Sequence, residues 1–362
     1  MRKILILANN DIGLYKFRKE LIQKLVQGYK VYISLPYGKH ISKLEEIGCE
    51  FIDTPISRRG TNPITDLKLL WNYKKIIKSI KPDIVLTYTI KPNVYGGIMC
   101  RINRVPYIPN ITGLGTAVEN GGLLQKITLR LYKASLKKAS CVFFQNKENK
   151  EFLSSKISID NHKLIPGSGV NLRHYSCLDY PQSREVHFLF IARVMKEKGI
   201  NEYLEAAEFI RDKYPYTKFH VLGFCEEEYE KKLKEMQDMD IIKYHGMQSD
   251  VREFHKFAHC TIHPTFYPEG MSNVLLESAA CGRPLITTNR SGCKEIVEEE
   301  RTGYIVKEKD SLDLIEKIEM FLSLDNKERE RMGTLGREKV EKEFNRDIVV
   351  NSYLEVIEKT LG

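Results

Sequence analysis

Short apolar runs alternate with helical segments along nearly the whole chain, and this alternation limits the possible folds more than any other feature. The first run, Lys3–Ala8, is followed by a helix from about Leu14 to Gln27, and Lys30–Ser34 reads as the next strand. Unbroken apolar runs are typical of strands that helices cover on both faces. The β-α-β order therefore predicts parallel, doubly wound sheets, which bind ligands beyond the carboxyl ends of their strands.

The alternation occurs twice, on either side of a segment rich in glycine and proline. We expect one domain over residues 1–166, a linker over 167–182 and a second domain over 183–345. Both domains are expected to be Rossmann-like α/β units. Further strands are expected at 50–53, 83–87, 107–109, 141–144, 187–192, 219–222, 241–244, 259–263, 284–287 and 304–306, and further helices near 39–47, 64–80, 92–103, 122–138, 146–154, 199–213, 226–237, 270–281, 310–323, 326–342 and 346–360.

The net charge differs sharply between the two halves of the chain. Residues 1–170 carry 28 Lys and Arg against 12 Asp and Glu, a charge of +16, whereas residues 171–362 carry 29 against 36, a charge of −7. A basic surface attracts nucleic acid, anionic lipid or phosphorylated substrates. No apolar run approaches the ~20 residues that cross a bilayer. The eight cysteines form no C-x-x-C pair, so we expect free thiols in a reducing cytosol.

Two carboxylates eight positions apart follow the expected strand 259–263. Glu269 is predicted to lie in the strand-to-helix loop and Glu277 about two turns into the helix. Helical positions 270, 273, 274 and 277 would share one face. The loop and the start of the helix would present N–H groups to an anion. For either Glu alone, a solvated surface carboxylate is an equally good interpretation.

Two cations and three glycines follow strands in the same way. Arg193 and Lys198 come after the first strand of the second domain, where a pair of cations could clamp a diphosphate. Gly13 lies in the equivalent loop of the first domain, and Gly223 and Gly246 follow later strands. Glycine there allows close approach to a ligand, or simply makes the turn. Solvated loop cations are the alternative for Arg193 and Lys198.

Two basic amphipathic helices in the first domain could face a membrane. One carries the only Trp, Trp71, and the other has a continuous stripe of cations from Lys126 to Lys137. Such helices bind anionic interfaces, although either alone could be the outer layer of a sheet.

The histidines show no metal-binding spacing, so we expect no metal site. The absence of aromatic-basic interleaving and of a helix-turn-helix pattern argues against nucleic acid.

Taken together, Arg193, Lys198 and the Glu269–Glu277 pair resemble the retaining glycosyltransferases of the GT-B fold, family four type. Asn93–Gly97 and Asn110–Gly115 look like a bacterial subgroup that builds capsule, O-antigen and other lipid-linked glycans. The resemblance spans essentially the whole chain. It implies two Rossmann-like domains with parallel sheets facing a central cleft, and a C-terminal helix, 346–362, that packs back on the first domain.

The resemblance implies a role for each matching residue. Arg193 and Lys198 would bind the donor diphosphate and neutralise the leaving nucleotide, Glu269 would contact the donor sugar, and Glu277 would accept hydrogen bonds from the ribose. Gly13 would let the first domain close on the diphosphate. The catalytic set is thus Glu269, Arg193 and Lys198, and the donor-binding set is Gly13, Arg193, Lys198, Gly246, Glu269, Gly270, Met271, Ser272, Asn273, Val274 and Glu277.

The resemblance also implies the acceptor and the place of action. A sugar, an N-acetylhexosamine or a hexose, would pass from a UDP-sugar to a polyprenyl-diphosphate glycan at the inner face of the cytoplasmic membrane, without a metal or other cofactor. Many relatives carry a His at the end of the strand that here reads Tyr107–Asn110. The candidate acceptor residues of this chain are Arg18, Lys91, Asn93, Asn110 and Thr112.

Two other functions remain open at this stage. A UDP-sugar 2-epimerase of the same fold would act without an acceptor and would have no use for basic amphipathic helices. A binding protein, such as a silent partner of a transferase, would not need the complete set of carboxylates and cations. The identity of the sugars, the linkage formed and the oligomeric state do not follow from the sequence.

Overall fold

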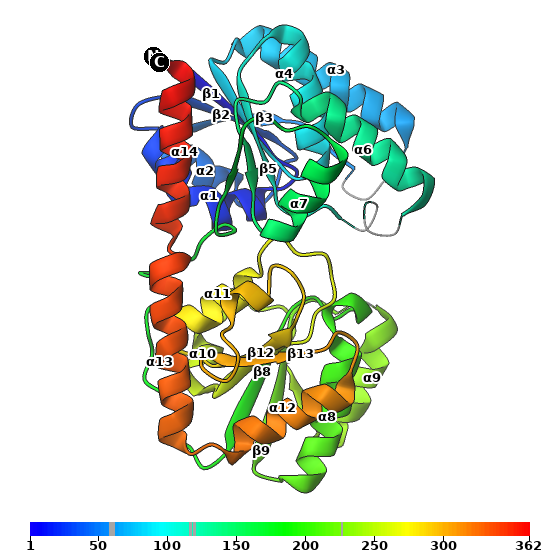
Figure 1. The fold of residues 1–362 in the computed structure, drawn as a ribbon, viewed down its shortest axis with the longest axis vertical. Coiled ribbons are helices and arrows are strands. Elements are labelled where there is room, and N and C mark those ends of the chain that lie inside the picture. The colour runs from blue at the N-terminus through cyan, green and yellow to red at the C-terminus, as the bar shows by residue number, and fades with distance from the viewer. Residues whose placement is uncertain (58–61, 116–117, 119–120, 226) are drawn as a thin grey trace. The chain divides into compact units, whose positions relative to one another are not determined.

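The computed structural model describes residues 1–57, 62–115, 118, 121–225 and 227–362, and the chain divides into two compact units. The first unit comprises Met1–Gly169 and Arg346–Gly362, and the second comprises Val170–Asn345 (Figure 1). Most of the expected linker, residues 170–182, therefore belongs to the second unit. Tyr180 explains why, because its buried hydroxyl donates a hydrogen bond of 2.9 Å to the carbonyl of His259.

The first unit is a seven-stranded parallel sheet in the order β3-β2-β1-β4-β5-β6-β7. The strands are β1 (Lys3–Leu7), β2 (Lys30–Leu35), β3 (Cys49–Asp53), β4 (Ile84–Tyr88), β5 (Tyr107–Ile111), β6 (Val142–Phe144) and β7 (His162–Leu164). One face packs against α1 (Asp11–Leu25), α2 (Ile41–Ile47) and α14 (Arg346–Leu361). The other packs against α3 (Pro63–Ile80), α4 (Gly97–Asn103), α6 (Gly122–Leu136) and α7 (Lys147–Lys156). The short edge strand β7 was not predicted.

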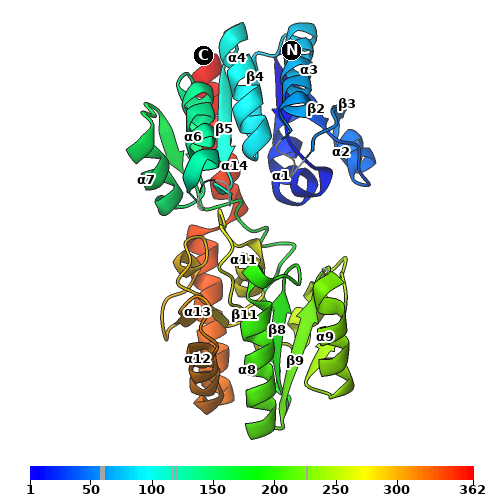
Figure 2. The same cartoon turned by 90° about the vertical axis from the view of Figure 1, so that its right-hand side faces the viewer.

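The second unit is a six-stranded parallel sheet in the order β10-β9-β8-β11-β12-β13. Its strands are β8 (Val186–Ile191), β9 (Thr217–Leu222), β10 (Ile242–Tyr244), β11 (Cys260–His263), β12 (Leu285–Thr288) and β13 (Gly303–Val306). The helices α8 (Ile200–Lys213), α9 (Glu227–Asp238) and α12 (Ser311–Ser323) share one core with the sheet. The opposite face carries α10 (Arg252–Phe257), α11 (Asn273–Ala280) and α13 (Asn326–Glu343) (Figure 1). Figure 2 shows α8 and α9 beside β8 and β9. The predicted start of α9 at residue 226 lies outside the described residues.

The strand order of the second sheet brings two functional loops together. The order reverses between β8 and its neighbour β11, so the connections after these strands leave on opposite faces of the sheet. In parallel sheets a crevice forms at this switch point, beyond the carboxyl ends of the strands. The loop after β8 carries Arg193 and Lys198, and the loop after β11 carries Glu269.

Among the helix boundaries that differ from the prediction, three bear on candidate residues, and the helix α10 was not predicted. Helix α1 begins at Asp11 because the Asn10 side chain caps it by accepting the Gly13 N–H, so Gly13 lies in the first helical turn and not in a loop. Helix α11 begins only at Asn273, with Ser272 as its cap. The expected helix 92–103 is a π-helical turn, Pro92–Gly96, followed by α4.

Candidate functional site

A glycine joins the loops after β8 and β11 at the switch point of the second sheet. Gly199 has φ 77°, and a Cβ there would lie 2.0 Å from the carbonyl oxygen of Pro264. The Phe266 N–H also donates to the carbonyl of Glu197 at 2.9 Å. Only glycine combines this backbone angle with so close an approach. The two loops are thereby held as one rigid piece.

Two cations and a carboxylate gather around one aromatic ring in this piece. Lys198 forms a half-buried ion pair with Glu269, the two side chains being 13% and 17% exposed. The Lys198 ammonium nitrogen lies 4.8 Å from the centre of the Tyr267 ring, and the Arg193 guanidinium carbon lies 5.8 Å from it. These three side chains contribute two positive charges and one negative charge. The predicted pair of cations and the first carboxylate therefore do lie together.

Tyr267 is a site residue that the sequence analysis missed. Its ring faces both cations, and its N–H donates to the Thr265 hydroxyl at 3.1 Å. A ring beside a cation contributes about 0.5–2 kcal/mol and holds the cation over its face. The available signal was an aromatic residue two positions before Glu269. It could not be used, because nothing in the sequence showed which loop Tyr267 would face.

A second glycine fixes the backbone around Glu269. Gly292 has φ 87°, and a Cβ there would lie 2.7 Å from the Gly270 carbonyl oxygen and 3.1 Å from the Glu269 Cβ. The Ser272 N–H donates to the Gly292 carbonyl at 2.7 Å. The loop was expected to present its N–H groups to an anion, and for Ser272 this is wrong, because its N–H is used within the protein. It holds the loop in place and is not directed at a ligand.

The start of α11 offers the remaining polar groups of the loop. Asn273 and Val274 are its first two residues, whose N–H groups lack acceptors within a helix. The Asn273 Oδ1 atom is buried and has no hydrogen-bond partner among the described residues. Met271 is buried in the core beneath the loop. Because the helix begins at Asn273, position 270 does not share its face, and that part of the predicted face is wrong.

Glu277 lies on α11 one turn after its start and is held by a tyrosine. The Tyr175 hydroxyl hydrogen-bonds to the Glu277 carboxylate. Burial, together with the charge of Glu277, raises the pKa of Tyr175 well above its usual value, so the hydroxyl stays protonated and donates. The Tyr175 carbonyl in turn accepts from Arg337 at 2.7 Å. Tyr175, from the segment predicted to be a linker, is a second residue that the sequence analysis missed.

His263 lies at the carboxyl end of β11, beneath the cation cluster. Both of its ring nitrogens are buried without a hydrogen-bond partner among the described residues. Burial, followed by the charge of Lys198, lowers the pKa of His263 to about 3. A neutral imidazole adds no third positive charge below Lys198. His263 therefore does not change the charge beside Lys198 at neutral pH.

The two other predicted glycines of the second unit, Gly223 and Gly246, differ in the space beside them. Gly246 has φ 65° and follows β10, and its carbonyl accepts the Gly223 N–H at 2.9 Å. A Cβ at Gly246 would meet no atom within 4 Å. At Gly223 a Cβ would lie 1.7 Å from the Ala192 carbonyl oxygen, immediately before Arg193. Gly223 is thus required for the fold of the Arg193 loop, whereas space remains beside Gly246.

Three of the five candidate acceptor residues are buried in the first unit. Asn93 donates to the Asn110 carbonyl at 2.7 Å and accepts from Thr87, and Asn110 donates to the Tyr353 hydroxyl at 2.6 Å. Arg18 packs its guanidinium 4.9 Å from the centre of the Tyr88 ring. Asn93 and Asn110 are therefore bonded inside the first unit and Arg18 lies against Tyr88, and their contact with an acceptor stays a prediction.

Lys91 and Thr112 are the two candidates that keep some exposure at the carboxyl end of the first sheet. Lys91 forms an ion pair of 2.6 Å with Asp66 at the start of α3. Tyr95, from the π-helical turn, donates to the same carboxylate at 2.8 Å. Thr112 is half-buried directly after β5. Lys91 and Asp66 therefore join the turn after β4 to α3.

Exposed apolar side chains lie on the first halves of α3 and α6. On α3 they are Ile64, Leu67 and Trp71, and on α6 they are Leu123, Leu124 and Ile127. Both helices run back along the same face of the sheet, so their first halves lie toward the carboxyl ends of its strands (Figure 1).

None of the described helices is long and apolar enough to span a membrane. Among the described residues, no group of three or more His, Cys, Asp or Glu is arranged to hold a metal ion.

Two family models match the chain, one in each unit. The model described as "Glycosyl transferase 4-like" matches residues 3–146, and that described as "Glycosyl transferases group 1" matches residues 181–339. The second match contains Arg193, Lys198, Glu269 and Glu277, and the first contains Gly13 and all five candidate acceptor residues.

Named relatives cover most of the chain. An N,N'-diacetylbacillosaminyl-diphospho-undecaprenol alpha-1,3-N-acetylgalactosaminyltransferase of Campylobacter jejuni is 25% identical over 99% of both chains. A UDP-Gal:alpha-D-GlcNAc-diphosphoundecaprenol alpha-1,3-galactosyltransferase of Escherichia coli is 26% identical over 70% of this chain and 69% of its own. The crystal structure of Anabaena Alr3699/HepE in complex with UDP and glucose superimposes with a TM-score of 0.80 at 16% identity, covering 99% of this chain and all of the other.

Proposed function

Because this chain belongs to the glycosyltransferases, with the two Rossmann-like units of the GT-B fold, we propose that it transfers a sugar from a UDP-sugar to a glycan carried on polyprenyl diphosphate. The proposal rests mainly on one observation: Arg193, Lys198 and Glu269 gather around Tyr267 at the switch point of the second sheet. The Campylobacter jejuni and Escherichia coli relatives, whose names specify diphospho-undecaprenol acceptors, support the choice of acceptor.

The donor diphosphate would bind at the cation cluster. The leaving UDP gains negative charge as the bond to the sugar breaks, and cations that are already in position stabilise that charge without reorganisation. Tyr267 holds Arg193 and Lys198 in position, and Glu269 keeps Lys198 directed toward the same side. In this proposal the two side chains supply the positive charge that the reaction needs, so we propose that no metal is required.

Glu269 and Glu277 would bind the two sugar rings of the donor. The carboxylate of Glu277, oriented by Tyr175, would accept hydrogen bonds from the ribose hydroxyls. Glu269 would contact the transferred sugar from the neighbouring loop. Asn273 adds a buried oxygen at the start of α11 that a donor hydroxyl would satisfy. Gly13, in the first turn of α1, and Gly246, with open space beside it, would allow close approach of the donor.

We propose that the sugar keeps its anomeric configuration. The acceptor hydroxyl would attack from the same face from which UDP departs, and an oxygen of the departing diphosphate would take the hydroxyl proton. The C–O bond to UDP breaks as the new C–O bond forms, and the proton leaves with UDP. Arg193 and Lys198 would hold that diphosphate close to the acceptor during this exchange.

The first unit would bring the lipid-linked acceptor to the donor. The exposed apolar residues on α3 and α6 are accompanied by exposed cations, among them Lys68 and Lys126. Apolar groups beside cations favour an anionic lipid surface. The enzyme would therefore act at the inner face of the cytoplasmic membrane, bound at its surface, with Lys91 and Thr112 closest to the acceptor.

Thermal unfolding with a panel of nucleotides tests donor binding. A ligand that binds the folded state alone raises the melting temperature. UDP should raise it in the wild type, and the Arg193→Gln/Lys198→Gln variant should lose most of this shift. An equal shift with the variant would contradict the proposed diphosphate site. Lys231→Gln/Lys234→Gln, on the exposed surface of α9, provides a control that changes the same net charge.

A further inference from the structure

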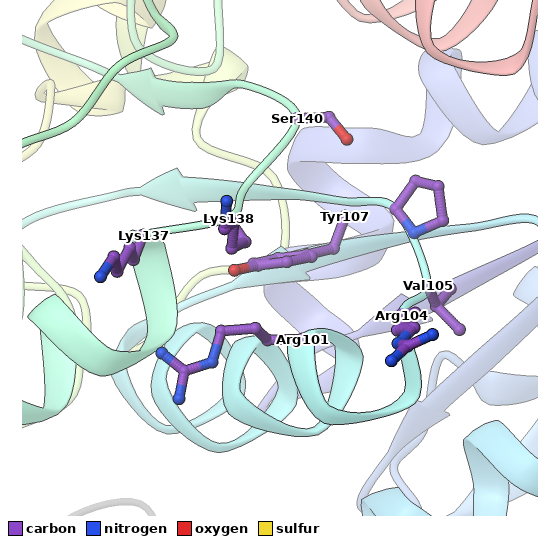
Figure 3. A pocket seen from close by; sticks show the side chains of 8 residues that line it. Arg101, Arg104, Val105, Tyr107, Lys137, Lys138 and Ser140 are labelled. Carbon is purple, nitrogen blue, oxygen red and sulfur yellow. The ribbon is translucent and has the colours of Figure 1, made fainter.

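A basic cavity lies in the first unit, at the amino ends of the strands. The candidate acceptor residues lie toward their carboxyl ends. It has a volume of about 570 Å³ and is lined by Arg101, Arg104, Val105, Pro106, Tyr107, Lys137, Lys138 and Ser140 (Figure 3). Tyr107 begins β5, whereas Asn110 lies near the end of that strand. The cavity is therefore at the amino end of the strand, about 10 Å from Asn110 along it.

The cations of the cavity come from the ends of two helices. Arg101 lies in the last turn of α4 and Arg104 caps it, while Lys137 and Lys138 follow the end of α6. Four of the eight lining residues are thus positively charged and none is negative. The two helix C-termini contribute roughly −1 in total at most. The cavity therefore keeps a charge of roughly +3 that no lining residue neutralises.

The cavity is built into the fold by close packing of α4 on α6. A Cβ at Gly97 would lie 3.1 Å from both the Cβ and the carbonyl oxygen of Ser135, so glycine lets the helices approach closely. Arg101, one turn beyond Gly97, donates to the Ala134 carbonyl at 2.8 Å. Tyr107, whose hydroxyl donates to the Ser135 carbonyl, is buried between them. Arg104 takes a left-handed conformation, φ 56°, at the turn into β5.

We propose that this cavity binds a soluble phosphorylated ligand, a phosphate or diphosphate ester. Arginine and lysine together are the side chains that most often bind phosphate. The volume lies within the ~300–1,000 Å³ of small-molecule sites and exceeds the need of a phosphate alone. The Val105 and Pro106 side chains, which are half-buried, add a carbon surface for an attached organic group.

The position of the cavity favours a soluble ligand over a lipid headgroup. The exposed apolar residues of α6 begin at Leu123, and Lys137 lies 14 residues further along the chain. At 1.5 Å per residue this is about 20 Å. A membrane that contacts Leu123 and Trp71 would thus lie at the other end of the helix. The ligand would then act as an effector, bound apart from the donor and acceptor sites.

Lysine acetylation read by mass spectrometry tests the proposal on the full chain. Sodium pyrophosphate should slow acetylation of Lys137 and Lys138 at least threefold and leave Lys147 and Lys156, on α7 of the same unit, unchanged. If pyrophosphate leaves acetylation unchanged at all four lysines, or slows all four equally, the proposal is overturned. The readout lies in the first unit, so failure of UDP to bind the second unit would not affect it.

A variant and a lipid arm complete the experiment. Arg104→Asn/Lys138→Gln keeps the left-handed turn, which Asn tolerates, and should raise about tenfold the pyrophosphate concentration needed to protect Lys137. In the matched control Lys147→Gln/Lys156→Gln, pyrophosphate should protect Lys137 as it does in the wild type. Unchanged protection in the cavity variant would overturn the proposal. Vesicles of phosphatidylglycerol and phosphatidylcholine form the lipid arm; protection of Lys137 and Lys138 by these vesicles and not by pyrophosphate would overturn the soluble ligand in favour of a lipid headgroup.

Discussion

Gly199 lies against Pro264 so closely that a Cβ would be 2.0 Å from the Pro264 carbonyl oxygen. This contact, between the loops after β8 and β11, brings Lys198 beside Glu269. The proximity of two residues 71 positions apart is therefore a property of the backbone. The ion pair forms on a scaffold that is already in place.

Gly199→Ala should consequently reduce both stability and UDP binding. The Cβ would meet a backbone carbonyl that cannot move without shifting β11, and the left-handed angle adds a further cost. We expect a loss of at least ~2 kcal/mol in the free energy of unfolding, measured by urea denaturation. Gly28→Ala is the control, because a Cβ there meets nothing within 4 Å, and its effect should stay within roughly 0.5 kcal/mol. Equal stability of both variants would contradict this account of the loop contact.

Tyr175→Phe should weaken the binding of UDP without unfolding the protein. The change removes only the hydroxyl that donates to Glu277, so that carboxylate loses its orientation. A hydrogen bond to a charged group corresponds to about tenfold in affinity, which calorimetry with UDP would measure. Tyr216→Phe, at a side chain 42% exposed in the same unit, should bind UDP as the wild type does. In a Glu277→Gln background Tyr175→Phe should add little; a full tenfold effect there would show that Tyr175 does not act through Glu277.

Lys198 and Glu269 should be energetically coupled in a double-mutant cycle. Each single change, Lys198→Gln or Glu269→Gln, leaves a half-buried charge without its partner, while the double variant removes both charges. The coupling should amount to roughly 1–3 kcal/mol in the free energy of unfolding. The exposed pair Lys231 and Glu235 is the comparison and should show no measurable coupling. Coupling of the same small size at both pairs would contradict the half-buried ion pair.

A row of histidines in the second unit predicts sensitivity to acid. His187, His220 and His245 are linked through their ring nitrogens at 3.0 and 2.9 Å, and the Nδ1 atom of His259 accepts the backbone N–H of His187. Burial lowers the pKa of all four, that of His220 and His259 to about 3. Charged neighbours of the row are Glu185, Lys218, Lys243, Arg283 and Arg329.

The sign of this effect follows from where the protons bind. Between pH 6.5 and about 3 the unfolded chain binds protons on His220 and His259 and the folded chain does not, so stability is complete above pH 6.5 and falls as the pH drops below it. The lowered pKa values of His187 and His245 act in the same direction. His220 alone should cost roughly 2 kcal/mol at pH 5. Urea denaturation at pH 7 and pH 5 measures the loss, which should be smaller in His220→Gln and unchanged in His162→Gln, at an exposed histidine. Identical pH dependence in all three proteins would exclude the row as its cause.

The fold was predictable because its main signal is local. Continuous apolar runs such as Lys3–Leu7 and Val186–Ile191 mark strands buried on both faces, and their order in the chain leaves few topologies. The helix starts were less predictable. Asn10 and Ser272 act as caps, and each decides its helix start by a side-chain hydrogen bond to one particular N–H.

The site was predictable in its charged residues and not in what holds them. Arg193, Lys198, Glu269 and Glu277 follow strands at recognisable spacing. Tyr267 and Tyr175 contact them across loops that only the tertiary structure brings together. For the same reason the hydrogen bonds that Asn93 and Asn110 make inside the first unit were not predicted.

Transfer of a sugar to a lipid-linked acceptor is the most direct measurement of the central claim. Purified protein would be mixed with each of a panel of UDP-sugars and with a polyprenyl-diphosphate glycan, and both UDP release and the mass and anomeric configuration of the product would be followed. We predict that one UDP-sugar gives UDP and glycosylated lipid in equal amounts, with the configuration of the donor retained, and that Arg193→Gln/Lys198→Gln abolishes both. Conversion of a UDP-sugar without acceptor, or no UDP release with any donor, would contradict the proposed function.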